Sequence, residues 1–178
     1  MTPLRPGFEM SRHNYFNVTS SERWTHLRLN IYPDGGVARL RVYGEISTDT
    51  DNFNGQEVDL LAMRNGGMCQ LYSDAHYGHP KNLTRPGRGR DMGDGWETAR
   101  RLDRPSILKV DERDILMVPG NEWVIFRLGC VGTVSSVEID TAHFKGNYPD
   151  SAKLEGAHIS TVEEEIQWST ILPPSKVS

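Results

Sequence analysis

The sequence is poor in cysteine, lacks a long apolar segment and has no excess of positive charge. Its 178 residues include two cysteines, Cys69 and Cys130, which are too few for a disulfide framework and lack the spacing of a zinc site. We therefore expect free thiols in a reducing compartment. No apolar run approaches the roughly 20 residues of a transmembrane helix, and the amino-terminal residues do not resemble a signal peptide. These absences predict a cytoplasmic protein without a membrane anchor.

The charge balance argues against nucleic acid as a partner. Lys and Arg number 20 against 24 Asp and Glu, a formal net charge of −4, which excludes general attraction to a polyanion. The basic run at 85–90 lacks the interleaved aromatic residues of a nucleic-acid site and is interpreted as a solvated loop. We therefore expect a small molecule as the ligand.

Short alternating segments predict strands. Residues 27–31 and 38–42 alternate apolar and polar side chains, and the turn-like segment 32–36 between them predicts a β-hairpin. A single short helix is expected at 57–63. Apolar runs bounded by turn residues predict further strands at 107–110, 123–128, 134–139 and 166–171. This pattern is typical of an all-β protein, an antiparallel β-sandwich.

A polar stretch at 45–52 separates the predicted hairpin from the remaining strands and has the composition of a linker. A two-stranded hairpin is marginal in water by itself, so it must pack against something. Either it belongs to the same sandwich as the later strands, or it is the end of a preceding domain.

The first group of residues suited to chemistry lies in the glycine-rich segment 91–101, which holds Trp96, Glu97, Arg100 and Arg101. Such a loop brings backbone N–H groups close to an anion, and an arginine fork grips a carboxylate with two hydrogen bonds. The alternative is a structural turn in which Trp96 belongs to the core and the charges form surface pairs.

A second group follows the predicted strand at 134–139. Alternation places Glu138 and Asp140 on one face, and the chain continues with polar side chains suited to binding an anionic, amide-rich molecule, namely Thr141, His143, Lys145 and Asn147. Histidine titrates near neutral pH, and Asp140 is suited to orienting it. The alternative is that His143 caps the strand and Lys145 is solvated.

The spacing of Asp74, His76 and His79 is a third, weaker signal. A carboxylate and two imidazoles are suited to a divalent metal, although anion contact or structural hydrogen bonds are the preferred interpretation. No cofactor is otherwise predicted.

Three blocks, 92–101, 123–129 and 139–149, resemble the allantoicase family and occur in the family's order. The resemblance implies a jelly-roll β-sandwich of the galactose-binding-like type, present in the family as two repeats, and hydrolysis of allantoate to ureidoglycolate and urea during allantoin degradation. Each block occurs once here, and 24–36 looks like the end of a first repeat. The implied division is a remnant of a preceding repeat at 1–46, a linker at 47–57 and a complete repeat at 58–178.

The resemblance also directs attention to particular side chains at these motif positions. We expect Arg100 or Arg101 with Lys145 to bind the substrate carboxylate, Asn147 and Thr141 to bind a ureido arm, and Trp96 to contribute to the binding site. His143, oriented by Asp140, is the first candidate for proton transfer, and Glu97 is the competing one. A homo-oligomer is expected. The alternatives are a non-catalytic ligand-binding or interaction module, or a truncated product that associates through its hairpin edges.

Overall fold

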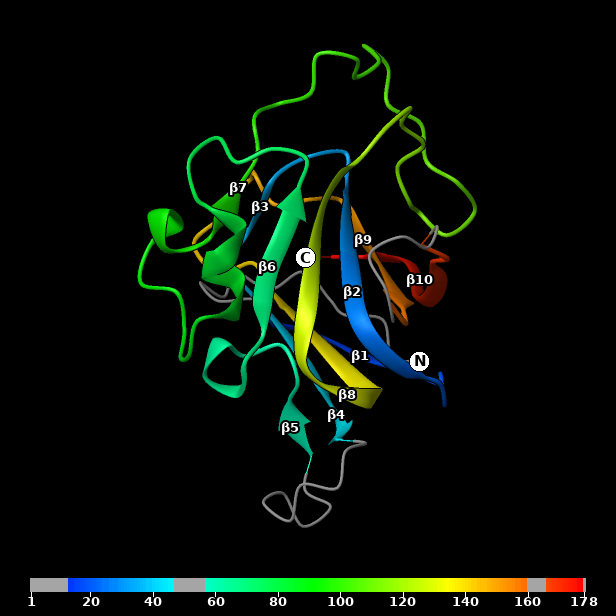
Figure 1. Ribbon diagram of the computed structural model, residues 1–178. Coiled ribbons are helices and arrows are strands. Elements are labelled where there is room, and N and C mark those ends of the chain that lie inside the picture. The colour runs from blue at the N-terminus through cyan, green and yellow to red at the C-terminus, as the bar shows by residue number, and fades with distance from the viewer. Residues whose placement is uncertain (1–12, 47–56, 160–165, 178) are drawn as a thin grey trace.

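The computed structural model describes residues 13–46, 57–159 and 166–177. The fold is an antiparallel β-sandwich, as predicted (Figure 1). Its strands are β1 (His13–Asn17), β2 (Arg23–Tyr32), β3 (Gly36–Val37), β4 (Arg39–Ile46), β5 (Val58–Asp59), β6 (Met68–Tyr72), β7 (Trp96–Glu97), β8 (Glu122–Asp140), β9 (Ser151–Ala157) and β10 (Ser169–Lys176). Three 3₁₀ turns are described, η1 (Met63–Asn65), η2 (Pro80–Thr84) and η3 (Met92–Asp94).

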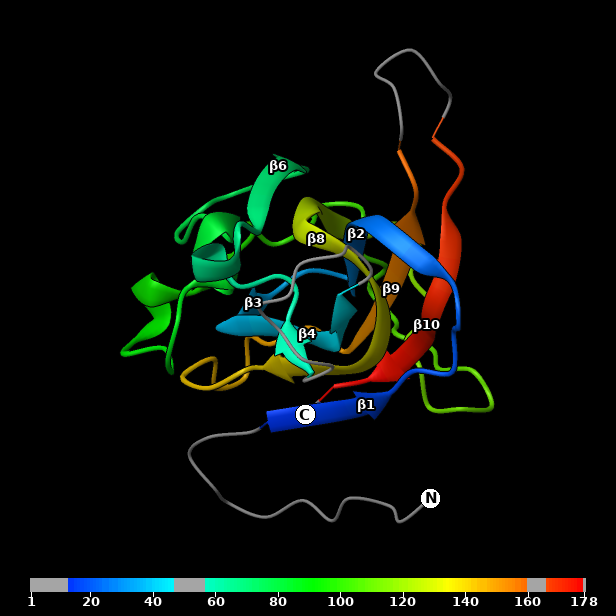
Figure 2. The ribbon, with the colours of Figure 1, turned by 60° about the horizontal axis from the view of Figure 1, so that its bottom comes forward.

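Strand β8 organises the sandwich because its two halves belong to different layers. The first half pairs with β2, Ile31 opposite Glu122, and with β6. The second half pairs with β4, Arg39 opposite Asp140, and with β1. Figure 2 shows the strand curving between these neighbours. The runs predicted as separate strands at 123–128 and 134–139 are therefore one continuous strand of 19 residues.

The core lies between the layers and follows the predicted alternation. Leu27, Leu29 and Ile31 on β2 are fully buried, as are Leu40 and Val42 on β4. Strand β8 adds core side chains from both of its halves, among them Val124, Phe126, Val137 and Ile139. Burial of these apolar side chains supplies the main favourable contribution to folding.

The predicted β-hairpin is wrong, although both of its strands form. The order β9-β2-β8-β4 places β8 between β2 and β4. The curved β8 offers one edge to each of them, so the intervening residues pass from one layer to the other, with β3 pairing β7 on the way. Strands on both sides of the predicted linker consequently share one sheet. The proposed division at 1–46, 47–57 and 58–178 stays a prediction, and residues 47–56 of the proposed linker lie outside the described residues.

Two other local predictions were wrong. The segment at 57–63 forms β5 and a turn instead of a helix, because Asp59 Oδ1 accepts hydrogen bonds from the backbone N–H groups of Leu61 and Ala62 at 3.0 and 3.1 Å. The run at 107–110 forms no strand apart from an isolated bridge at Val110. Its apolar side chains Ile107, Leu108 and Val110 are exposed.

Both cysteines are free thiols, as predicted. Burial raises the pKa of Cys69 to about 11, so this thiol is protonated and unreactive at neutral pH. Within the described ranges, no helix has the length and apolar character needed to cross a membrane.

Candidate active site

A pocket of about 590 Å³ lies beside β3 and β7. Its walls come from five segments of the sequence: the turn after β2, the loop at 76–77, the stretch from β7 to Arg104, the loop residue Leu116, and the loop at 146–150. The volume falls in the range usual for small-molecule sites.

Glu97 and Asn147 form the polar centre of this pocket. The Asn147 Nδ2 amide donates a hydrogen bond of 2.7 Å to Glu97 Oε1. The backbone holds both residues in place: the carbonyl of Glu97 accepts from the N–H of His76 at 3.0 Å, and the carbonyl of Asn147 accepts from the N–H of Gly36 at 2.8 Å. The carboxylate and the amide therefore sit on fixed segments, and the partly exposed Glu97 keeps a second carboxylate oxygen for a ligand.

Gly35 allows the turn after β2 to approach the loop at 146–150. Its φ is +138°, and an added Cβ would lie 2.7 Å from the backbone nitrogen of Pro149. Only glycine fits such a contact and such a φ without strain. The Gly35 N–H also donates to Thr98 Oγ1 at 3.2 Å. Thr98 therefore joins the turn after β2 to the stretch that follows β7, both of which line the pocket.

Two arginines provide positive charge to the pocket. Arg104 forms an ion pair of 3.7 Å with Asp34, and its buried Nε has no hydrogen-bond partner among the described residues. Arg100 is exposed and makes no hydrogen bond or ion pair within the described part of the chain. A guanidinium with free donors beside a pocket is suited to binding a carboxylate.

The adjacent Arg101 points elsewhere. Its guanidinium lies 2.5 Å from Asp103 and 3.1 Å from Glu122, and it is not among the described residues that line the pocket. Of the two arginines that the sequence left as alternatives, Arg100 is therefore the one at the pocket.

His143 and Asp140 are not arranged as the predicted pair. The Nε2 atom of His143 lies 2.8 Å from the carbonyl oxygen of Gly89, whereas Asp140 Oδ1 accepts from the N–H of Ala142 at 2.9 Å. Asp140 is fully buried and faces His13 and Arg88. Within the described chain, neither His143 nor Asp140 lines the pocket, so Asp140 does not orient His143.

Three other predicted binding residues, Trp96, Thr141 and Lys145, are not among the described residues that line the pocket. Trp96 is fully buried, and its Nε1 donates to the carbonyl of Asp74 at 2.8 Å, which is the structural alternative considered for this residue. Thr141 is also buried. Lys145 is exposed but lies outside the described lining of the pocket.

Asp74, His76 and His79 have separate roles. Asp74 Oδ2 accepts from the N–H of Ala99 at 2.7 Å, and His79 Nδ1 accepts from the N–H of Lys81 at 3.1 Å. His76 lines the pocket and stacks edge-on against Tyr77 with ring centroids 4.4 Å apart. Over the described residues, the one group of metal-ligating side chains that converges is a different one, His13, Glu138 and Asp140.

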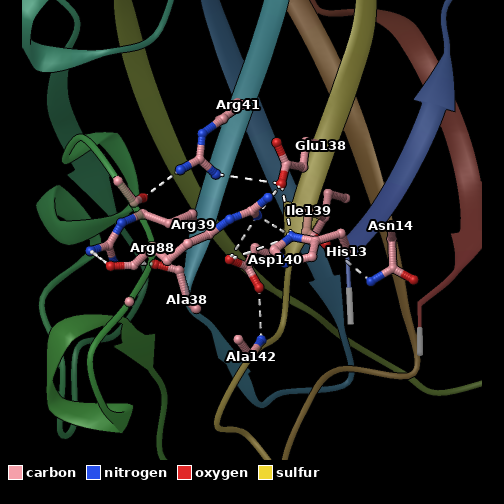
Figure 3. Close-up of polar contacts among 12 residues, drawn as sticks. His13, Asn14, Ala38, Arg39, Arg41, Arg88, Glu138, Ile139, Asp140 and Ala142 are labelled. Carbon is pink, nitrogen blue, oxygen red and sulfur yellow. Dashed lines mark hydrogen bonds and ion pairs between the residues drawn. The ribbon is translucent and has the colours of Figure 1, made fainter. Parts of the chain in front are cut away.

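A second charged region lies on the outer face of β4 and the second half of β8 (Figure 3). We call it the arginine–carboxylate network. It contains His13, Arg39, Arg41, Arg85, Arg88, Arg90, Asp94, Glu138 and Asp140. The arginines at 85–90, predicted to be a solvated loop, are exposed and at the same time paired with these carboxylates.

Asp94 is the centre of one half of this network. Its carboxylate lies 3.0 Å from the buried Arg39 and 2.5 Å from Arg85. Burial by itself would raise the pKa of Asp94, but the hydrogen bonds from Arg39 and from the Arg90 N–H, with the nearby positive charges, outweigh it and lower that pKa. Asp94 therefore stays ionised and anchors the glycine-rich loop to β4.

Sequence reasoning missed Asp34, Arg104 and Tyr77 as pocket residues. Asp34 stands in the predicted turn directly before Gly35, and this position in the turn is a local signal in the sequence. Arg104 and Tyr77 carry no local pattern, because only the packing of separate loops brings them to the pocket.

Comparison with known proteins places this geometry in context. The family model described as "Allantoicase repeat" matches residues 2–47 and 58–178. A "Probable allantoicase" from Acinetobacter baylyi is 49% identical over 152 residues, covering 84% of this chain and 40% of the relative. A protein of the same name from Pseudomonas savastanoi pv. phaseolicola is 44% identical over 186 residues, covering 99% of this chain and 52% of the relative.

A third "Probable allantoicase", from Acinetobacter baumannii, is 44% identical over 168 residues, covering 91% of this chain and 45% of the relative. The chain thus spans about half the length of the curated relatives it matches. No solved structure matches it.

Proposed function

The chain belongs to the allantoicase family, and from that premise we propose that it hydrolyses allantoate to ureidoglycolate and urea in the pocket at β7. The observation that carries the proposal is the Glu97 carboxylate, held at 2.7 Å by the Asn147 amide, in a pocket that Arg100 also lines.

The chemistry of allantoate is complementary to these side chains. The molecule has one carboxylate and two ureido groups on a single carbon. The guanidinium of Arg100, unpaired among the described residues, is suited to the carboxylate through charge-assisted hydrogen bonds, and Arg104 adds positive charge at the pocket wall. The ureido groups both donate and accept, which suits Glu97, Asn147 and the hydroxyl of Tyr77. We assign the carboxylate to the arginines and one ureido arm to Glu97 and Asn147.

Glu97 is the residue we assign to proton transfer. The bond that breaks joins the central carbon to one ureido nitrogen, and that nitrogen must gain a proton for neutral urea to leave. The oxygen of a water molecule bonds to the central carbon, and the water supplies the proton that restores the balance. A carboxyl group held beside the bond can deliver the first proton and accept the second. Asn147 acts as a positioning residue by fixing the Glu97 carboxylate.

The test is urea release from allantoate by the 178-residue protein, with calorimetric titration of allantoate on the same sample. Release of equal amounts of urea and ureidoglycolate supports the proposal. Binding without release would favour the alternative of a non-catalytic binding module, and the absence of both binding and release would overturn the assignment of this pocket to allantoate.

We propose that the protein works in the cytoplasm, as a homo-oligomer, and takes no nucleic acid as a partner. The formal net charge of −4 supports the last of these. Light scattering on the purified chain measures the oligomeric state, and a monomer at all concentrations would contradict the second.

A further inference from the structure

Three side chains that ligate metals in proteins converge away from the proposed active site, where β1 pairs with β8. His13, Glu138 and Asp140 each present one ligand atom, and these atoms all lie within 4.8 Å of one another. Figure 3 shows the three side chains directed toward a common point. His13 is opposite Asp140 in the strand register, so regular β-pairing holds the group together.

Spacing within the group fits a small cation. His13 Nδ1 lies 2.8 Å from Glu138 Oε1 and 3.7 Å from Asp140 Oδ2. Ligand atoms about 2.1 Å from a tetrahedral ion lie roughly 3.4 Å apart, so the observed separations bracket the required one. An imidazole with two carboxylates is the donor set of first-row transition ions rather than of Ca²⁺ or Mg²⁺.

Both carboxylates are buried, and one oxygen of Asp140 is incompletely satisfied. The side chain of Glu138 is 2% exposed and that of Asp140 is 0% exposed. Asp140 Oδ2, the atom directed into the group, has no hydrogen-bond partner among the described residues. A buried carboxylate oxygen without a partner is costly, and a bound cation removes that cost.

Arg88 also reaches this group, but it is close to Glu138 and farther from Asp140. Its Nη1 lies 2.6 Å from Glu138 Oε1 and 3.6 Å from Asp140 Oδ2, and it also contacts His13 Nδ1. Arg88 thus leaves Asp140 Oδ2 without a hydrogen bond among the described residues. A divalent cation can bind the lone pair of the imidazole and balance the charges of both carboxylates.

We propose that His13, Glu138 and Asp140 bind one divalent transition-metal ion, with Zn²⁺ as the representative, and that the Arg88 side chain swings out when the ion binds. Arg88 is suited to leaving because its side chain is 53% exposed. Three protein ligands leave at least one coordination position for water. The ion fastens β1 to β8, which joins the beginning of the described chain to the centre of the sandwich.

The experiment titrates chelator-treated protein with Zn²⁺ alone by calorimetry and repeats it with Co²⁺, whose visible absorption reports nitrogen and oxygen ligation. We expect one equivalent to bind and the melting temperature to rise with the ion. His13→Ala should weaken binding by more than the roughly 10–100-fold that loss of an outer hydrogen-bond partner costs. The matched control is His79→Ala, which removes an imidazole from a different loop and should bind as the wild type does.

Arg88→Ala separates this proposal from a purely structural ion-pair network. If the ion displaces the arginine, the variant should bind Zn²⁺ more tightly by up to about fivefold, the equivalent of an exposed ion pair. Unchanged or weaker binding would overturn the displacement.

Asp140→Asn is the second test of the ligands. If this variant does not fold, His13→Ala still tests the metal site, because His13 lies on the partly exposed edge. Absence of stoichiometric binding to the wild type, or binding that His13→Ala leaves intact, would overturn the site. Because no arm of the experiment uses allantoate, its failure is distinct from failure of the proposed function.

Discussion

The pocket and the arginine–carboxylate network both contain arginines and carboxylates, but they differ in how far these side chains are buried and paired. In the pocket, Arg100 is exposed and Glu97 is partly exposed, with one carboxylate oxygen bound by Asn147. In the network, Asp94 and Arg39 are buried and engage each other at 3.0 Å. The comparison teaches that a charged side chain can contact a substrate entering from solvent when the fold leaves it partly exposed and incompletely paired, as it does for Arg100 and Glu97 but not for Asp94 and Arg39.

A single motif contributes to both regions. Asp94 and Glu97 stand three residues apart in the glycine-rich segment, yet Asp94 enters the network and Glu97 faces the pocket. The strand pair β3–β7 causes the separation, since it fixes Glu97 opposite Gly36. Substitutions at these positions are therefore expected to affect different measured quantities.

The largest effect is expected from Glu97→Gln, which keeps the shape of the side chain and removes its ability to transfer a proton. Urea release should fall by about 10²–10⁴-fold with little change in the free energy of unfolding. The matched control is Glu112→Gln, an exposed carboxylate outside the described lining of the pocket. Activity of the Glu97 variant within a few fold of the wild type would remove Glu97 from proton transfer.

Asp94→Asn should instead reduce stability, because it leaves the buried Arg39 charge without its carboxylate. Loss of one partner of a buried pair costs about 3–5 kcal/mol, measurable by guanidinium denaturation. The control is Asp103→Asn, which breaks the exposed pair with Arg101 and should reduce the free energy of unfolding far less, because solvent screens an exposed pair. Equal losses in the two variants would contradict the contrast between buried and exposed pairs.

Because the pKa of Asp94 is lowered, the stability that this buried carboxylate contributes depends on pH. Its contribution to stability is fully present above the ordinary carboxyl pKa of about 4 and is lost as the pH falls through the lower value in the folded state. The wild type should therefore lose more stability on acidification than Asp94→Asn does. Parallel unfolding curves across that range would show that Asp94 is not the group responsible.

Arg100→Ala and Arg101→Ala compare two neighbours that the sequence does not distinguish. A hydrogen bond to a charged group contributes about 1.5–3 kcal/mol, so loss of Arg100 should weaken allantoate binding by roughly 10- to 150-fold. Arg101→Ala should alter binding by less than about threefold, since its guanidinium engages Asp103 and Glu122. Calorimetric titration measures both, and the reverse order would place the carboxylate at Arg101.

The smallest effect is expected from His143→Ala. Its ring contacts the Gly89 carbonyl and lies outside the described lining of the pocket, so urea release should stay within about threefold of the wild type. A loss of 10²-fold or more, the size typical of a positioned acid or base, would restore His143 to the mechanism.

The sequence predicts the strands well because alternation is a local property. The buried positions Leu27, Leu29, Leu40 and Val42 follow directly from the period of two. Strand pairing did not follow, because the hairpin prediction assumed that neighbours in sequence pair. The curvature of β8, which separates β2 from β4, has no signature in that pattern.

The candidate site was predictable in part for the same reason. Glu97, Arg100 and Asn147 stand in motifs that local reasoning singles out, and the pocket brings all three together. The choice between Arg100 and Arg101 depends on partners at 103 and 122, and the contact between His13 and Glu138 joins residues 125 positions apart. Such contacts depend on the packing of the whole chain.

The long curved strand has a consequence for how the protein loses its structure. Because β8 pairs with strands of both layers, the two layers share one continuous backbone segment. We therefore expect the layers to unfold together, as is usual for small single domains.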